Sequence, residues 1–129
     1  MSIQIRKVSS KKELKTFVRF ANRLYKGNKY YVPSMPMDDM NTFTPEKNGA
    51  FDFSEAELYL AYKGDEVVGR VAAIINHKAN EAWKVKQVRF GWIDFIDDLE
   101  VSKALIDAVV AFGKARGMEQ VVGPLGFTD

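Results

Sequence analysis

The sequence predicts an α+β fold, in which a mixed and mostly antiparallel sheet carries helices on both faces. Residues 55–62 and 66–76 read as strands joined by the tight turn Lys63-Gly64-Asp65-Glu66, which predicts an antiparallel hairpin. Residues 88–124 read strand, helix, strand. Two strands joined through one crossover helix should be parallel neighbours, so the sheet combines both kinds of pairing.

The first elements are a short strand over residues 2–8 and an amphipathic helix over residues 11–26. Ser10 and Glu13 have the spacing of a capping box, and Gly27 follows as a C-terminal stop. One face of this helix is apolar, and the other is basic. The basic face is either simply solvated or a surface for phosphates or nucleic acid. Its members are Lys12, Lys15, Arg19, Arg23 and Lys26.

Residues 28–53 form the least regular segment, with one or two helical turns expected over residues 37–43. A long loop on a rigid scaffold can carry binding, or it can be a packed connection. Residues 80–87 are polar apart from Ala82, Trp83 and Val85, and they predict another connection, either irregular or with one helical turn. Gly69 lies inside the second hairpin strand, which indicates a bulge or the close approach of another group.

Residues 88–96 are apolar enough to form a strand that is buried on both faces. With regular alternation, Asp94 shares a face with Phe90 and Trp92. A helix is predicted over residues 98–116, with Asp97 and Glu100 at the spacing of a capping box. Residues 118–123 then extend again. The buried stripe of the helix is expected at Val101, Ala104, Leu105, Ala108, Val109 and Phe112.

With 129 residues, the chain is predicted to form one domain over residues 1–129. It has one histidine and no cysteine, so disulfides are excluded and no metal site is expected. No apolar run is long enough for a signal peptide or a bilayer span, so we expect a cytoplasmic protein without a membrane partner. The net charge of +2 is too small to indicate a nucleic-acid partner by itself.

This order of elements resembles the GNAT superfamily of acyl-CoA N-acyltransferases. Leu60-Ala61-Tyr62 and Val67-Val68-Gly69-Arg70-Val71-Ala72-Ala73 are similar to the second and third strands of that family. Tyr31-Val32-Pro33 and Gly123-Pro124 resemble a little-described bacterial branch. The resemblance covers nearly the whole chain but stops before the family's last helix and two strands. It therefore implies a domain truncated after the fifth strand.

The resemblance implies transfer of an acyl group from acyl-CoA to a small-molecule amine. It places acetyl-CoA between the fourth and fifth strands, beside Gly91, Trp92 and Ile93. The family's pyrophosphate loop, Gln/Arg-x-x-Gly-x-Gly/Ala, would fall on Asp97, Glu100 and Ser102. Carboxylates there stabilise the helix start but repel phosphate, and side chains crowd the turn. We therefore expect acetyl-CoA to bind weakly or not at all.

Asp94 is the candidate catalytic residue, because the family often uses an acid on the fourth strand as general base. The alternative is a degenerate GNAT-like module that binds or assembles without catalysis. A fifth strand with no further neighbour would leave an open edge, and open edges recruit partners. We therefore expect self-association through this edge. Apolar side chains expected near it are Val121, Val122, Leu125 and Phe127.

Overall fold

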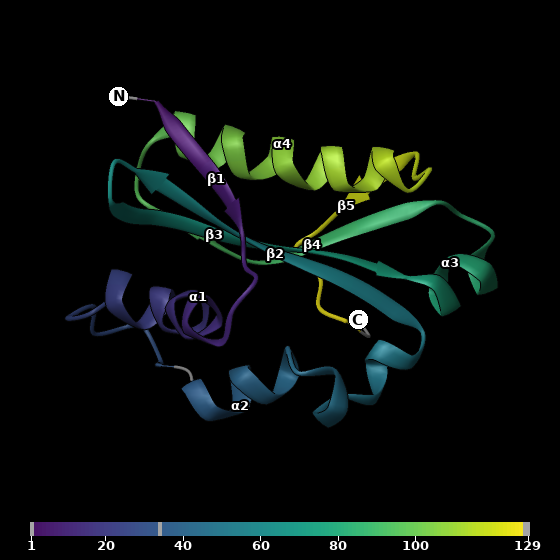
Figure 1. The fold of residues 1–129 in the computed structure, drawn as a ribbon, viewed down its shortest axis with the longest axis horizontal. Helices are drawn as coiled ribbons and strands as arrows, with labels where there is room; N and C mark the ends of the chain where they lie inside the picture. Colours follow the sequence, from purple (N-terminus) through teal and green to yellow (C-terminus); the bar gives the residue numbers. More distant parts are fainter. Residues whose placement is uncertain (1, 34, 128–129) are drawn as a thin grey trace.

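The computed structural model describes residues 2–33 and 35–127. Its sheet has the strand order β1-β2-β3-β4-β5, in which every neighbouring pair is antiparallel except the parallel pair β4–β5. This confirms the predicted mixed, mostly antiparallel sheet. In chain order the elements are β1 (Ile3–Lys7), α1 (Lys11–Leu24), α2 (Pro36–Thr42), η1 (Pro45–Lys47), η2 (Gly49–Asp52), β2 (Ser54–Lys63), β3 (Glu66–Asn76), α3 (His77–Trp83), β4 (Gln87–Phe95), α4 (Leu99–Ala115) and β5 (Gln120–Val122) (Figure 1).

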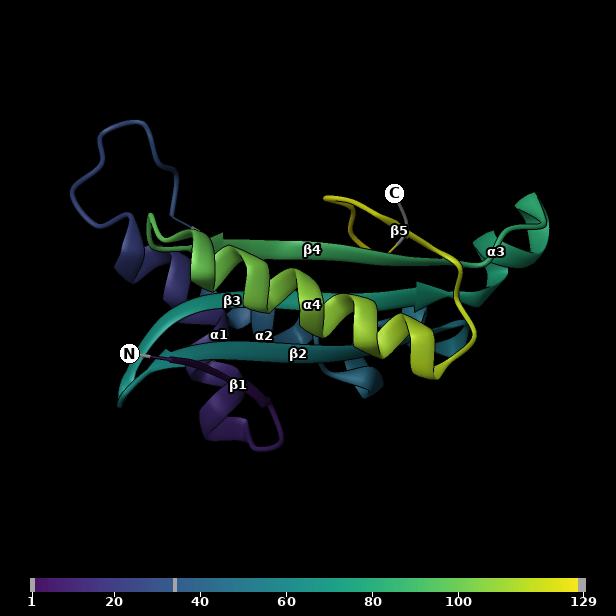
Figure 2. The same cartoon turned by 90° about the horizontal axis from the view of Figure 1, so that it is seen from above.

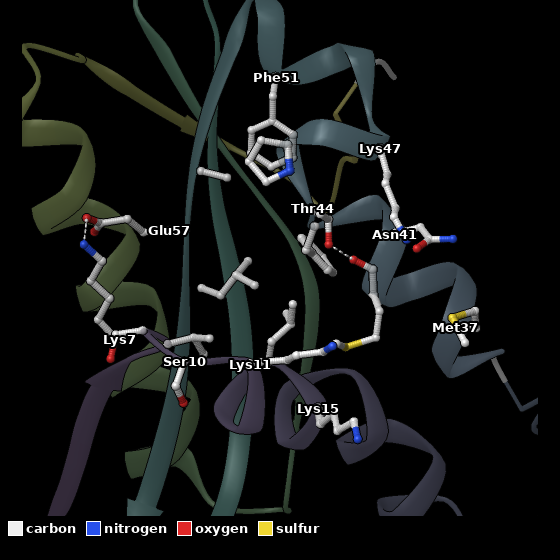
Figure 3. Close-up of a pocket in the computed structure, with 18 residues that line it drawn as sticks. Lys7, Ser10, Lys11, Lys15, Met37, Asn41, Thr44, Lys47, Phe51 and Glu57 are labelled. Atoms are coloured by element: carbon white, nitrogen blue, oxygen red, sulfur yellow. Dashed lines mark hydrogen bonds and ion pairs between the residues drawn. The ribbon is translucent and has the colours of Figure 1, made fainter.

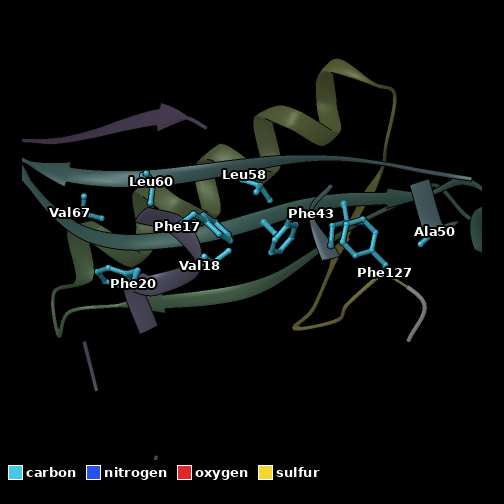
Figure 4. Close-up of a cluster of buried hydrophobic side chains, with 11 residues drawn as sticks. Phe17, Val18, Phe20, Phe43, Ala50, Leu58, Leu60, Val67 and Phe127 are labelled. Carbon is cyan, nitrogen blue, oxygen red and sulfur yellow. The ribbon is translucent and has the colours of Figure 1, made fainter. Parts of the chain in front are cut away.

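Helices cover both faces of the sheet, as predicted. α4 lies along one face, and α1, α2 and the short 3₁₀ helices lie under the other (Figures 1 and 2). α4 docks through the expected stripe, because Val101, Leu105, Val109 and Phe112 are all buried. On the other face, α1 places Phe17 and Val18 against β2 and β3 in a second cluster (Figure 4).

The two long helices begin at identifiable caps. Ser10 Oγ accepts the N–H of Glu13, as in the predicted capping box, whereas the Glu13 carboxylate accepts the N–H of Ser9, one residue before the N-cap. At α4 the N-cap is Asp98 and not Asp97, because Asp98 Oδ1 accepts the N–H of Glu100 at 2.9 Å. The capping pair predicted from Asp97 is therefore wrong by one residue.

Gly69 lies both at a bulge and at a close approach of another element, the two features that a glycine inside a strand can indicate. The β2–β3 register slips beside it, from Ala61 opposite Gly69 to Tyr62 opposite Val67. A Cβ on Gly69 would lie 2.9 Å from Val101 Cγ1, so the missing side chain lets α4 approach the sheet closely.

Two segments differ from the predictions. Residues 77–83 form α3, which begins earlier and is longer than the single helical turn allowed for residues 80–87, because Asn76 at the end of β3 caps it. Phe127 does not lie at the open edge of β5. It is 5% exposed and turns under the sheet, where Asn76 Nδ2 donates to its carbonyl at 2.8 Å.

Candidate functional site

A bulge in β4 is the central feature of the candidate site. Arg70 pairs with Asp94 and Ala72 pairs with Gly91, so Trp92 and Ile93 together oppose one residue of β3. Trp92 has φ of 45°, in the left-handed region that large side chains seldom adopt. Backbone outliers of this kind concentrate at functional sites, which makes Trp92 a marker for one.

The bulge also changes which side chains share a face. One extra residue shifts the two-residue alternation of a strand by one position. Trp92 packs against the cluster under α1 and α2, whereas Phe90 and Ile93 pack against the cluster under α4. The prediction that Asp94 shares a face with Phe90 is therefore wrong, because it assumed regular alternation.

A small cavity of about 280 Å³ lies beside the bulge, where the chain leaves β5. Leu125 N–H donates to the Phe90 carbonyl at 2.9 Å, which brings residues 124–126 alongside β4. A Cβ on Gly91 would come within 2.4 Å of the Leu125 carbonyl oxygen, so this approach requires glycine. The lining residues are Gly91, Trp92, Pro124, Leu125 and Gly126.

Asp94 is held by two partners that lie far from it in the sequence. Its Oδ1 accepts a hydrogen bond from the Tyr25 hydroxyl at 3.0 Å, and its Oδ2 pairs with Arg70 Nη2 at 2.9 Å. Burial, together with the hydrogen bond to Asp94, raises the pKa of Tyr25. Arg70 in turn donates to the Phe17 carbonyl. Both carboxylate oxygens of Asp94 are thus engaged, and its predicted catalytic role stays a prediction.

The first turn of α4 offers little to a pyrophosphate. Asp98 Oδ1 already accepts the N–H of Glu100, and Asp98 Oδ2 lies 3.5 Å from Lys63 Nζ. The N–H groups of Val101 and Ser102 both donate to the Asp98 carbonyl, and the Ser102 hydroxyl donates to Leu99. The residues of this turn therefore do not form a cradle for the phosphates of an acyl-CoA.

The predicted site residues fall in separate places. Gly91 and Trp92 line one cavity, Ile93 faces the α4 layer, and Ser102 lies in the first turn of α4 outside that cavity. The contacts of Tyr25 and Arg70 with Asp94 were not predicted. The resemblance had singled out Arg70 within Val-Gly-Arg, but nothing in the sequence linked Tyr25 to Asp94 across 69 positions.

Within residues 2–33 and 35–127, no helix has the length and apolar character needed to span a bilayer. The same residues contain no group of three or more acidic, histidine or cysteine side chains placed to hold a metal ion.

Comparison with solved structures identifies the class of fold. A tandem GNAT protein from the clavulanic acid biosynthesis pathway superposes with a TM-score of 0.68 at 10% identity, over 91% of this chain and 34% of that one. AAC(6')-Iy in complex with the bisubstrate analogue CoA-S-monomethyl-acetylneamine gives 0.66 at 17% identity, over 98% and 81%. Glucosamine-6-phosphate N-acetyltransferase from Arabidopsis thaliana gives 0.64 at 12%, over 98% and 84%. The chain has the fold of the GNAT acetyltransferases.

Two curated proteins are more similar in sequence. Protein YghO of Escherichia coli K12 is 31% identical over 120 residues, which is 93% of this chain and 30% of that protein. Bacterial ceramide synthase of Caulobacter vibrioides is 30% identical over 122 residues, which is 94% of this chain and 32% of that protein. The chain thus spans about a third of the length of these relatives. No protein-family model matches the chain.

Proposed function

We propose that this chain is the GNAT-fold part of a cytoplasmic N-acyltransferase that moves an acyl group from acyl-CoA to the amine of a small molecule. The observation that carries the proposal is the bulge at Trp92 with its adjacent cavity. A strained, bulged strand beside a cavity is a feature that folds retain for ligand chemistry.

The names of the similar proteins support the reaction class. Aminoglycoside and glucosamine-phosphate acetyltransferases act on amines, and one structural neighbour holds a CoA analogue. Ceramide is itself an N-acyl amide, so the name of the Caulobacter relative describes a product of the same bond type. We therefore assign the amine as acceptor and leave its further structure to experiment.

Attack of an amine on a thioester forms a C–N bond and breaks a C–S bond, and the amine must lose a proton. Asp94 is our candidate for the group that takes this proton. Its position depends on Arg70 and Tyr25, which hold the carboxylate on the α1 side of β4. Gly91 gives residues 124–126 the room to lie against β4, and Trp92 forms one wall of the cavity proposed for the acyl end.

The second candidate function is a module that binds or assembles without catalysis. It is favoured by the first turn of α4, where Asp97, Asp98 and Glu100 stand in place of a phosphate cradle. Carboxylates at this position repel an anionic cofactor and stabilise the helix instead.

Release of free thiol from acetyl-CoA and from a long-chain acyl-CoA separates the two candidates. The assay is run with an aminosugar and with a long-chain amino alcohol as acceptors. The acyltransferase proposal expects amine-dependent thiol release that Asp94→Asn abolishes and that Trp83→Phe, a change at an exposed site on α3, leaves intact. Thiol release that is absent with every acyl donor and acceptor would favour the non-catalytic module.

A further inference from the structure

A second cavity, larger than the one beside the β4 bulge, lies elsewhere in the described residues. It has a volume of about 870 Å³ and opens between α1, α2 and β2 (Figure 3). This volume is near the upper end of the range of roughly 300–1,000 Å³ that small-molecule sites occupy. Its floor is apolar and comes from several elements. The apolar residues are Val8, Leu14, Met40, Phe43, Phe51, Ala56 and Leu58.

The mouth of this cavity is positively charged. Lys11 extends from α1 across the opening, Lys15 lies beside it on α1, and Lys47 is on the opposite rim (Figure 3). No hydrogen bond or ion pair of these three ammonium groups is found within residues 2–33 and 35–127. Unpaired cations at the opening of an apolar cavity attract an anion whose remainder is apolar.

The acidic groups in the cavity lining and in the first turn of α1 do not neutralise this charge. Glu57 also borders the cavity, but its carboxylate pairs with Lys7 Nζ at 3.0 Å on the α4 side of β2, as Figure 3 shows. Glu13, in the first turn of α1, accepts hydrogen bonds from Ser9 and Ser10. Lys11, Lys15 and Lys47 therefore remain as excess positive charge at the mouth.

We propose that this cavity binds a single-chain amphiphile with an anionic headgroup, such as a long-chain carboxylate or alkyl phosphate. The alkyl chain lies on the floor formed by Leu14, Phe43 and Leu58, and the headgroup lies between Lys15 and Lys47. This assignment does not rest on the proposed acyltransferase activity, because the site is separate from the bulge. The ring of Phe43 belongs to the cavity floor and separates the cavity from the bulge, because its centroid lies 4.8 Å from that of the Trp92 ring.

Trp92 supplies the readout for a binding experiment. In a Trp83→Phe background it is the remaining tryptophan, and its emission should change when an alkyl chain contacts Phe43. The probes are octanoate, decanoate and dodecanoate below their micelle concentrations, with dodecyl phosphate, dodecanol and dodecylammonium for comparison. Each added methylene should tighten carboxylate binding about fourfold until the cavity is full.

The variants separate the headgroup from the chain. Lys11→Gln, Lys15→Gln and Lys47→Gln together should weaken dodecanoate binding at least about tenfold and leave dodecanol binding unchanged. The matched control changes Lys12, Lys26 and Lys114 to Gln, because these lysines are exposed and do not line the cavity. Ala56→Phe, which fills the floor, should abolish binding of every probe, with folding checked by circular dichroism.

Dodecanoate or dodecyl phosphate binding with this chain-length dependence and lysine dependence supports the proposal. Four results would overturn it: equal affinity for dodecylammonium, an equal loss in the control lysine variant, binding that persists in Ala56→Phe, or no binding. A signal that needs anionic vesicles and is absent with monomeric amphiphiles would also overturn it. That result would assign the lysines to a membrane surface instead.

Discussion

The guanidinium of Arg70 and the carboxylate of Asp94 form an ion pair across β3 and β4, with Nη2 and Oδ2 2.9 Å apart. The pair lies directly after the bulge at Trp92, and the Arg70 side chain is only 6% exposed. Asp94, the candidate general base, is therefore also the counter-ion of a buried cation. Substitutions at Asp94 are expected to change both activity and stability.

Asp94→Asn should lower the free energy of unfolding by about 2–4 kcal/mol, because it leaves the buried Arg70 charge without its counter-ion. Urea denaturation measures this change. Asp65→Asn is the matched control, since Asp65 lies in the exposed turn between β2 and β3. An Asp94 variant as stable as the control would show that the ion pair contributes nothing net. Activity is then compared only at temperatures where parent and variant are both folded.

The Tyr25 hydroxyl donates a hydrogen bond to Asp94, and this bond predicts that the difference in stability between the parent and Tyr25→Phe depends on pH. The raised pKa of Tyr25 means that the folded state holds this proton when the unfolded state loses it, near the ordinary value of 10.0. The resulting stabilisation is complete below pH 10 and is lost as pH rises through the folded pKa. Urea denaturation at several pH values should show parent and Tyr25→Phe converging in stability above pH 10. The pKa of Tyr59 is also raised, but Tyr59 is present in both proteins, so its effect cancels. A constant difference across this range would contradict the assignment.

Gly91→Ala should displace the segment that forms the small cavity. The new Cβ would meet the Leu125 carbonyl oxygen at 2.4 Å, and backbone atoms cannot yield cheaply there. We expect a loss of about 1–3 kcal/mol in unfolding free energy and a change in Trp92 emission. Gly49→Ala is the control, because a Cβ at Gly49 would meet no atom within 4 Å. If both variants behave alike, the close approach of Leu125 is not required for stability.

Acetyl-CoA is expected to bind weakly or not at all, because carboxylates occupy the first turn of α4. Replacing Asp97, Asp98 and Glu100 with Arg, Gly and Gly should raise affinity in titration calorimetry. It should also lower stability, because glycine in place of the N-cap Asp98 costs a few tenths of a kcal/mol and glycine in place of Glu100 costs up to about 1 kcal/mol. Glu46→Arg with Asp52→Arg, two charge reversals at exposed sites in η1 and η2, makes the same change in net charge and controls for charge alone. Tight binding by the parent protein would refute this view of the turn.

Self-association through β5 remains a prediction. Among the described strands, β5 pairs with β4 alone, and Val121 is 39% exposed on it. Light scattering should show a mass that grows with protein concentration, and Val121→Lys should reduce that growth because charge on an open edge opposes pairing. A constant monomer mass over a wide concentration range would count against the prediction.

Local patterns in the sequence determined the hairpin of β2 and β3, the buried stripe of α4 and the capped start of α1. In each case the information lies within a few neighbouring residues, as with Ser10 and Glu13, and burial of one face then selects the conformation. The order of these elements was enough to indicate the GNAT fold.

The site itself was decided by tertiary structure. The bulge at Trp92 lies where β4 pairs with β3. The assumption of regular alternation therefore placed Phe90 and Asp94 on the same face of β4, and they lie on opposite faces. Asp94 meets Tyr25 across 69 positions, Phe127 turns under the sheet to Asn76, and the lysine-rimmed cavity exists only where α1 and α2 meet β2. Such contacts depend on how separate elements dock, and docking is set by the packing of the whole core rather than by the spacing of residues along the chain.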